Sequence, residues 1–317
     1  MKKATPTLKK VSILIPAYNE EAVIETLYGR LDALSVKANG YDFEFFFVND
    51  GSRDNTMTII RNLAEMDQRV SFINLSRNFG KEIAMVAGLD HVSGDATVII
   101  DADLQDPPEL ISTMLSYWEE GYDDVYARRT HRKGETWLKR TTSSLFYKIL
   151  QNSTQITIQR DTGDFRLLDR RCIEALRQFR ESQRYTKGLF SWIGYKKKEI
   201  TYERDPRAAG KTKWSYLKLI DLAIEGIVSF TTAPLRWSSI FGAFVSLLAF
   251  AYIIFIVART LLYGSNVGGY PSLMAVILFL GGVQLLSLGI IGEYIGRIFN
   301  ETKHRPLYFI EDMKQRD

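Results

Sequence analysis

The chain has 317 residues, enough for one large globular domain with additional segments, and its net charge of +4 is too small to indicate nucleic-acid binding. A single cysteine, Cys172, excludes an internal disulfide and is typical of a reducing compartment. Because only three histidines accompany it, a zinc site is not expected.

The N-terminal part of the chain alternates short apolar runs with helical patterns. The apolar runs are nearly continuous, as expected for strands that are covered on both faces. They occupy residues 11–16, 43–48, 70–75 and 96–100. The helical patterns between them occupy residues 20–34, 56–66 and 82–92. Strands that alternate with helices predict an α/β domain with a Rossmann-like, mostly parallel sheet.

A polar cluster follows each of these predicted strands. The clusters are "AYNEE", "NDGSRDN", "SRNFGKE" and "DADLQD". In doubly wound sheets, ligands bind at the carboxyl ends of the strands. The four clusters are therefore expected to converge on one edge of the sheet and to form a ligand site there.

The last of these clusters concentrates carboxylates, with Asp101 and Asp103 two residues apart and Gln105 beyond them. These oxygen ligands suit Mg²⁺ or Mn²⁺ rather than zinc or copper. Mg²⁺ is typically held by one or two carboxylates and completes its shell with water and substrate phosphates, which a diphosphate leaving group would supply. Asp106, directly before two prolines, is instead typical of a helix N-cap.

Further along the chain, the segment "DDVYAR" at residues 123–128 resembles another strand, and residues 215–230 form a one-sided helical pattern. In the helical pattern Lys218, Asp221 and Glu225 recur at spacings of three and four. Such a helix is suited to the membrane interface. The alternative is an amphipathic helix packed on the globular domain, and different faces of one helix can serve both purposes.

Two long apolar runs without charge, residues 237–258 and 270–292, dominate the C-terminal part. Each can cross the hydrocarbon core of a bilayer, which needs about 20 residues of helix. The alternative is a pair of buried core helices, but a soluble core seldom needs two such runs in succession. A two-helix transmembrane anchor is therefore predicted.

Basic residues are distributed unevenly around the two spans. The connecting loop holds only Arg259, whereas several Lys and Arg residues flank the pair. By the positive-inside rule this predicts a multi-pass protein of the inner cell membrane with its N-terminal domain and both termini in the cytoplasm. The apolar run at residues 11–17 is too short for a signal peptide. Small residues in "GAFVS" and "LGGVQ" would let helices approach closely, so a homo-oligomer formed through the membrane helices is one expectation.

Six motifs between residues 11 and 214 resemble those of family 2 glycosyltransferases with the GT-A fold. They are "VSILIPAYNEE", "FVNDGSRDNT", "LSRNFGKEIA", "DADLQDPPEL", "TGDFRLLDRR" and "RAAGKTKW". Within that family the chain most resembles the polyprenyl-phosphate branch, which includes dolichyl-phosphate mannose synthases and bactoprenol glucosyltransferases. The two apolar spans are similar to the bactoprenol type.

The resemblance implies four regions. They are a GT-A domain at residues 1–213, an interfacial helix at 214–234, two transmembrane helices at 235–298 and a cytoplasmic tail at 299–317. It also implies an inverting transfer of a hexose from a nucleotide sugar to undecaprenyl or another polyprenyl phosphate, which supplies a lipid-linked sugar for cell-envelope or O-antigen glycosylation. UDP-glucose is the first choice of donor, and mannose or a modified aminosugar remains an alternative.

The resemblance places several residues at the nucleotide sugar. They are Pro16, Tyr18, Glu20, Asp50, Arg77, Lys81, Asp101, Asp103, Gln105, Arg207 and Lys213. Within this set Asp50 is expected at the base, whereas Asn49 stands where many relatives carry a second aspartate. Asp101, Asp103 and Gln105 correspond to the metal and diphosphate site. Arg207 and Lys213 belong to a basic loop that closes over the phosphates in relatives.

The acceptor side is expected to use Arg128 and Arg140 for the lipid phosphate, and Asp103, Asp164 and Arg207 are the expected catalytic residues. Asp164 is either a general base or a residue that orders arginines or sugar hydroxyls. The second interpretation remains open because a phosphate monoester, with a second pKa of about 6, needs little proton removal.

Two other functions share some of these features. A processive polysaccharide synthase would carry a Q-x-x-R-W signature, which this sequence lacks, and two spans are few for a polymer channel. A catalytically inactive membrane scaffold, or an accessory subunit of a lipid carrier, would have no need of the intact acidic cluster or of the basic loop.

Overall fold

The computed structural model describes residues 8–130, 162–182, 184–202, 231–263 and 269–316. The chain divides into two compact units. The first combines Met1–Leu219 with Pro306–Asp317, and the second is Ile220–Arg305. The predicted interfacial helix at residues 215–230 lies outside the described residues.

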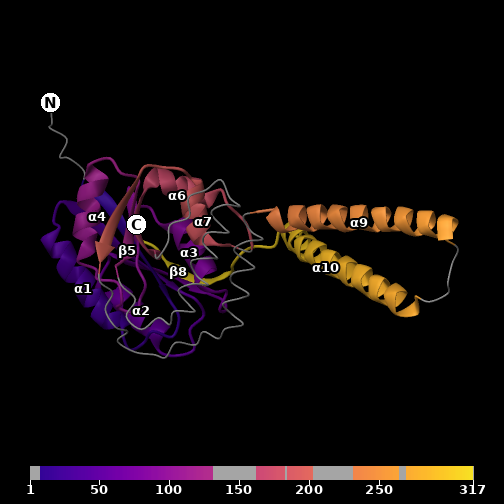
Figure 1. Ribbon diagram of the computed structural model, residues 1–317. Helices are drawn as coiled ribbons and strands as arrows, with labels where there is room; N and C mark the ends of the chain where they lie inside the picture. The colour runs from indigo at the N-terminus through magenta and orange to yellow at the C-terminus, as the bar shows by residue number, and fades with distance from the viewer. Residues whose placement is uncertain (1–7, 131–161, 183, 203–230, 264–268, 317) are drawn as a thin grey trace. The chain divides into compact units, whose positions relative to one another are not determined.

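The described part of the first unit is built on one eight-stranded sheet (Figure 1). In sheet order its strands are β7 (Lys197–Tyr202), β5 (Asp124–Arg129), β6 (Thr162–Asp169), β4 (Ala96–Ile99), β1 (Lys9–Ala17), β2 (Tyr41–Asn49), β3 (Val70–Leu75) and β8 (Ile310–Lys314). β4, β1, β2 and β3 are parallel neighbours, while β6 and β8 run antiparallel to the strands beside them. The prediction of a mostly parallel sheet is confirmed.

Helices cover both faces of the sheet (Figure 1). One face carries α1 (Ile24–Lys37), α2 (Thr56–Met66) and α4 (Leu110–Glu119), whose apolar residues share one core with the strands. The other face carries α3 (Lys81–His91), α6 (Arg170–Arg177) and α7 (Thr186–Trp192). The apolar runs of the strands contain no polar alternation because residues on both faces of the sheet are buried. In β2, Phe45 and Phe47 enter the first core, and Phe46, between them, is also fully buried.

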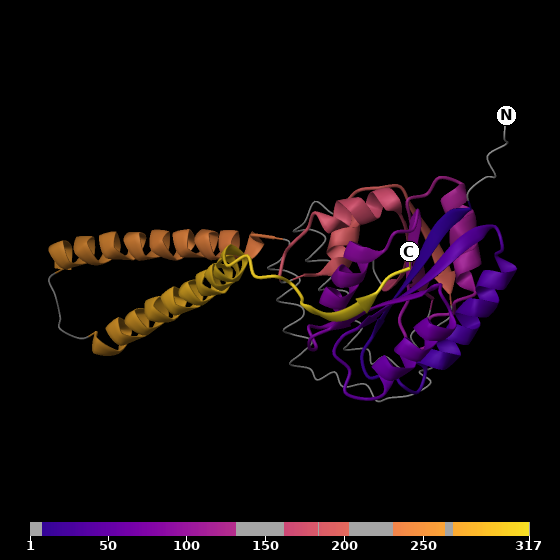
Figure 2. The same cartoon turned by 180° about the vertical axis from the view of Figure 1, so that it is seen from behind.

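The C-terminal residues are part of this sheet rather than a separate tail. β8 pairs antiparallel with β3 at the sheet edge, and it is the yellow strand in Figure 2. Asp312 on β8 pairs with Arg61 on α2 at 2.9 Å, and Arg316 pairs with Asp42 at the start of β2 at 2.8 Å. Part of the segment predicted as a cytoplasmic tail, residues 310–314, thus forms an edge strand of the sheet.

The second unit consists, in its described part, of the two helices α9 (Ala233–Tyr263) and α10 (Tyr270–Thr302). By length and composition both are able to cross a membrane. The Ser238 hydroxyl donates to Ser287 Oγ at 3.0 Å, and the Tyr294 hydroxyl donates to the Thr231 carbonyl at 2.7 Å. Most large apolar side chains along both helices are exposed, so the alternative of two buried core helices is not supported.

Candidate active site

The predicted convergence of strand ends brings a lysine between two carboxylates. Lys81 begins α3, Asp101 follows β4, and Asp164 lies near the start of β6. The Lys81 Nζ lies 2.6 Å from Asp101 Oδ1 and 2.5 Å from Asp164 Oδ2. The Lys81 side chain is 42% exposed, so this cluster is open to a ligand from solvent.

Positive charge around Asp164 keeps its carboxylate ionised. Burial opposes ionisation, but the ammonium groups of Lys81 and Lys187 outweigh it and lower the pKa of Asp164 to about 2. A carboxylate with so low a pKa is a weak proton acceptor at neutral pH. The electrostatics therefore favour the ordering role of Asp164 over the general-base role.

Two residues of α7, Thr186 and Lys187, extend the cluster on the same side of the sheet, and neither was predicted from the sequence. The Thr186 hydroxyl donates to the Glu82 carboxylate on α3. Burial, together with the charge of Asp164, raises the pKa of Glu82 to about 7, and burial lowers the pKa of Lys187. A threonine and a lysine in a short helix carry no recognisable motif, so only the fold identifies them.

The turn after β4 presents the second acidic residue. Asp103 Oδ1 accepts a hydrogen bond from the Gln105 backbone amide at 3.2 Å, and Leu104 between them has a left-handed φ of 58°. Gln105 itself is only 6% exposed. The tight turn thus places Asp101 and Asp103 together at the edge of the sheet.

The acidic residues of this turn fit a weakly held divalent cation. Within the described residues, no group of three or more His, Cys, Asp and Glu side chains could hold a metal ion. Two carboxylates with the remaining positions left to water and phosphate oxygens match the preference of Mg²⁺ and Mn²⁺. The Lys81 ammonium contacts Asp101 as well and neutralises part of its charge.

Asp106 has a different role from the predicted N-cap. It is fully buried, and it accepts a hydrogen bond from the Tyr202 hydroxyl on β7. Helix α4 begins only at Leu110, with Glu109 at the cap position and without a side-chain cap. The prediction was wrong because the carbonyl of Pro107 accepts the Leu110 amide at 3.2 Å, so a backbone turn precedes the helix.

The two adjacent arginines at the end of β5 point to different partners. Arg128 is exposed, and its Nη1 lies 3.0 Å from Glu199 Oε1 on β7. Arg129 is partly buried, donates from Nε to the Tyr202 hydroxyl at 3.2 Å, and its Nη2 lies near Gly163, the residue before Asp164. The Arg129 guanidinium is also within electrostatic range of Asp101 and Lys187, whereas Arg128 pairs with Glu199, and the expected role of Arg128 at the lipid phosphate stays a prediction.

Three predicted donor residues lie at or just after the end of β1. Pro16 is buried in β1, and Tyr18 is 40% exposed. The Glu20 backbone amide donates to Thr56 Oγ1 at 2.8 Å, which ties this loop to the start of α2. Of the remaining predicted residues, Arg140, Arg207 and Lys213 lie outside the described residues.

Asp50, expected at the nucleotide base, holds the neighbouring loop. Its two carboxylate oxygens accept the backbone amides of Phe79 and Gly80 at 2.7 and 2.9 Å, and burial raises its pKa. Arg77 in the same loop stacks over the Phe79 ring, with 3.9 Å between the guanidinium carbon and the ring centroid. Asp50 thus shapes the loop that leads to Lys81, and its expected contact with the base stays a prediction.

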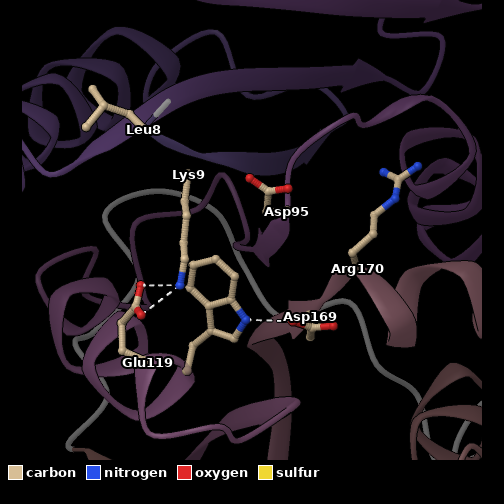
Figure 3. Close-up of a pocket in the computed structure, with 7 residues that line it drawn as sticks. Leu8, Lys9, Asp95, Glu119, Asp169 and Arg170 are labelled. Carbon is tan, nitrogen blue, oxygen red and sulfur yellow. Dashed lines mark hydrogen bonds and ion pairs between the residues drawn. The ribbon is translucent and has the colours of Figure 1, made fainter. Parts of the chain in front are cut away.

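A cavity of about 490 Å³ lies at the opposite edge of the sheet, where β1 and β4 begin. Figure 3 shows its lining residues, of which Leu8, Lys9, Asp95, Glu119, Asp169 and Arg170 are labelled. Its prominent polar groups have protein partners: Lys9 pairs with Glu119 at 2.7 Å, and the Trp118 indole donates to Asp169 at 2.8 Å (Figure 3). This edge lacks the acidic pair and the cluster around Lys81, so it is not the candidate active site.

Comparisons with known proteins point to one family. Residues 12–177 match the model of glycosyl transferase family 2, and residues 233–298 match that of the GtrB C-terminal hairpin. An uncharacterized glycosyltransferase of Synechocystis is 48% identical, over 96% of this chain and 95% of that protein. The bactoprenol glucosyl transferase of Shigella phage SfV is 44% identical over 97% and 100%. A prophage bactoprenol glucosyl transferase homolog of Escherichia coli is 43% identical over 96% and 100%.

Proposed function

Because the chain belongs to glycosyl transferase family 2, we propose that it transfers glucose from UDP-glucose to undecaprenyl or another polyprenyl phosphate. The names of the bactoprenol glucosyl transferases support glucose and a bactoprenol acceptor, since those proteins match almost the whole chain. The observation that carries the proposal is the Lys81 bridge between Asp101 and Asp164, with Arg129 within electrostatic range of Asp101. It unites an acidic donor side with a cationic acceptor side.

On the donor side, Asp101 and Asp103 would hold Mg²⁺ or Mn²⁺, which would neutralise charge on the leaving diphosphate. The Lys81 ammonium lies between the carboxylates of Asp101 and Asp164 and contacts both of them. Asp50 holds the loop that precedes Lys81, so the ammonium is positioned before the donor binds.

On the acceptor side, the guanidinium of Arg129 would hold the lipid phosphate. Its Nε donates a hydrogen bond to the Tyr202 hydroxyl. The other N–H groups of a guanidinium form a planar pair of donors that matches two phosphate oxygens. The phosphate attacks the anomeric carbon from the face opposite the leaving diphosphate, so one displacement inverts the configuration. Asp164 keeps Lys81 in place and is not required to remove a proton.

The apolar hairpin gives the proposed reaction its location. The isoprenoid tail of the acceptor stays in the bilayer, so the sugar has to be added at the membrane surface. Helices α9 and α10 are able to cross a membrane, and Lys303 and Arg305 follow the second of them. By the positive-inside rule the catalytic unit would then face the cytoplasm, where nucleotide sugars are made.

The pH dependence of transfer should come from the acceptor and not from Asp164. The lipid phosphate loses its second charge below about pH 6 and becomes a weaker nucleophile. Asp164, with a pKa of about 2, stays ionised throughout this range. We expect kcat/KM for the lipid to fall with a midpoint near pH 6 both in the unmodified chain and in the residual activity of Asp164→Asn. Loss of this acid limb in the variant would instead identify Asp164 as a general base.

A donor panel tests the proposed function directly. Membranes that contain the full chain are supplied with labelled UDP-, GDP- or dTDP-sugars, with and without undecaprenyl phosphate, and lipid-extractable label is counted. UDP-glucose is expected to label the lipid only when the acceptor is present. Labelling from GDP-mannose or from an aminosugar donor would reassign the sugar, and no labelling from any donor would favour the inactive scaffold.

A further inference from the structure

The strand that follows the second membrane helix returns to the catalytic sheet after a short link. Helix α10 ends at Thr302 and β8 begins at Ile310, so residues 303–309 make the whole connection. The Tyr308 hydroxyl in this link donates to Asp90 Oδ2 at 3.0 Å, and its ring lies edge-on to His91. Both partners lie at the C-terminal end of α3, the helix that begins with Lys81.

A row of hydrogen bonds leads from β8 across the sheet. Glu311 Oε2 on β8 accepts from Asn74 Nδ2 on β3 at 2.8 Å. Asn74 Oδ1 in turn accepts from Asn49 Nδ2 on β2 at 2.7 Å. Asn49 is 1% exposed and Asn74 is 6% exposed, so water cannot readily replace the bond between them, whereas Glu311 itself is exposed.

The row ends at the loop that leads to Lys81. Asn49 directly precedes Asp50, whose carboxylate accepts the amides of Phe79 and Gly80. The next residue, Gly51, has a φ of 64° and leaves no room for a Cβ against the backbone of the same loop. The loop formed by residues 76–80 is therefore built onto the turn at Asn49.

β8 also holds the other end of this loop. The Ser76 backbone amide donates to the Phe309 carbonyl at 3.0 Å, directly before β8 begins. The loop is thus fixed at its start by the chain that leaves the membrane helix and at its end by Asp50. Loss of the Glu311 contact would leave the Asn74 amide without this acceptor and free it to rotate, which would break its bond to Asn49 as well.

We infer that Glu311 is a positioning residue for the nucleotide sugar, acting through Asn74 and Asn49 on the loop at residues 76–80. The inference rests on the proposed function, because the ligand of this loop is taken to be the UDP part of the donor. It also assigns a role to the C-terminal strand, since the chain that leaves the membrane hairpin is attached to the donor loop and not only to the surface of the catalytic unit.

Glu311→Ala in the full chain tests this inference. The Kd for UDP with Mn²⁺, measured by calorimetry, and KM for UDP-glucose should each rise about tenfold, the effect of one lost hydrogen bond to a charged group. KM for the lipid acceptor should stay within about twofold, because the loop does not carry Arg129. Glu311→Gln should restore UDP binding, since its amide oxygen still accepts from Asn74.

The matched control is the next residue of the same strand. Asp312→Ala removes an exposed ion pair with Arg61 and should leave UDP binding unchanged. Asn49→Ala breaks the row from its other end and provides a second route if Glu311→Ala folds poorly. The double variant should then bind UDP no worse than the weaker single variant, because both changes interrupt one path.

Three results would overturn the inference. They are normal UDP affinity in a folded Glu311→Ala chain, equal losses in Glu311→Ala and Asp312→Ala, and no rescue by Glu311→Gln. An unmodified chain that binds no UDP would contradict the proposed donor instead. The binding of the nucleotide that the donor panel identifies is then measured for the same variants. A wrong donor assignment is thereby distinguished from a wrong role for Glu311.

Discussion

Asp103→Asn should lower glucosyl transfer about a thousandfold, because metal stabilisation of a leaving diphosphate supplies several kcal/mol. The substitution removes the charge but keeps an oxygen that is able to accept the Gln105 amide, so the turn after β4 should persist. Calorimetry with Mn²⁺ and UDP should show weaker binding in parallel with the loss of transfer.

Asp42→Asn is the control for this experiment, since Asp42 lies at the start of β2, on the opposite edge of the sheet, and pairs with Arg316. It should leave Mn²⁺ binding and transfer unchanged. If Asp103→Asn kept transfer within about threefold of the unmodified chain at saturating Mn²⁺ and donor, the acidic turn would not be the metal site.

Arg129→Ala should lower kcat/KM for the lipid acceptor about a hundredfold while UDP affinity stays normal, because it removes a charged phosphate ligand. Arg128→Ala, one residue away, should change kcat/KM by less than about fivefold, since it removes only an exposed ion pair with Glu199. Transfer rates against lipid concentration, together with UDP calorimetry, distinguish the two.

This pair of variants discriminates between the sequence-based and structure-based assignments of the acceptor site. A large loss in Arg128→Ala with little effect in Arg129→Ala would restore Arg128 as the phosphate ligand. Because Arg129 also binds Tyr202, thermal unfolding must show that its variant is folded. Arg129→Lys keeps the charge but loses the planar fork of N–H donors, so its kcat/KM for the lipid acceptor should lie between those of the two alanine variants.

Much of the fold follows from hydrophobic periodicity. The first four strands and the helices between them form apolar patterns of the expected period, and the structure places them within a few residues of the prediction. The family resemblance taken from six motifs is confirmed by the match over residues 12–177, and the predicted apolar pair by the match over 233–298.

Strands β6 and β8 were not predicted, because they carry charged residues at positions where a strand pattern is apolar. β6 contains Arg166, which is fully buried against Asp124 at 3.1 Å and stacked on Phe190. β8, "IEDMK", is a polar edge strand without an apolar run, and it pairs with β3, more than 200 residues earlier in the chain. Only tertiary contacts make strands of these segments.

The candidate site shows the same division. Strand-end reasoning predicted that the clusters holding Lys81 and Asp101 would meet, the family resemblance added Asp164, and the three side chains do lie together. The sequence does not distinguish the surroundings of Arg128 from those of Arg129, because these depend on the register of β5 against β7. The loop-holding contacts of Asp50 could not be predicted either, because the partners of its carboxylate are backbone amides, which no sequence pattern reports.

The most direct test of the account is the structure of the product made by the purified full chain in liposomes. UDP-glucose, undecaprenyl phosphate and Mn²⁺ are supplied, and the lipid extract is analysed by mass spectrometry and by NMR of the anomeric centre. We expect glucosyl undecaprenyl phosphate with a β linkage, inverted from the α linkage of the donor, and no such product when the acceptor is omitted. Retained α configuration, or release of free glucose with no lipid-linked sugar, would contradict it.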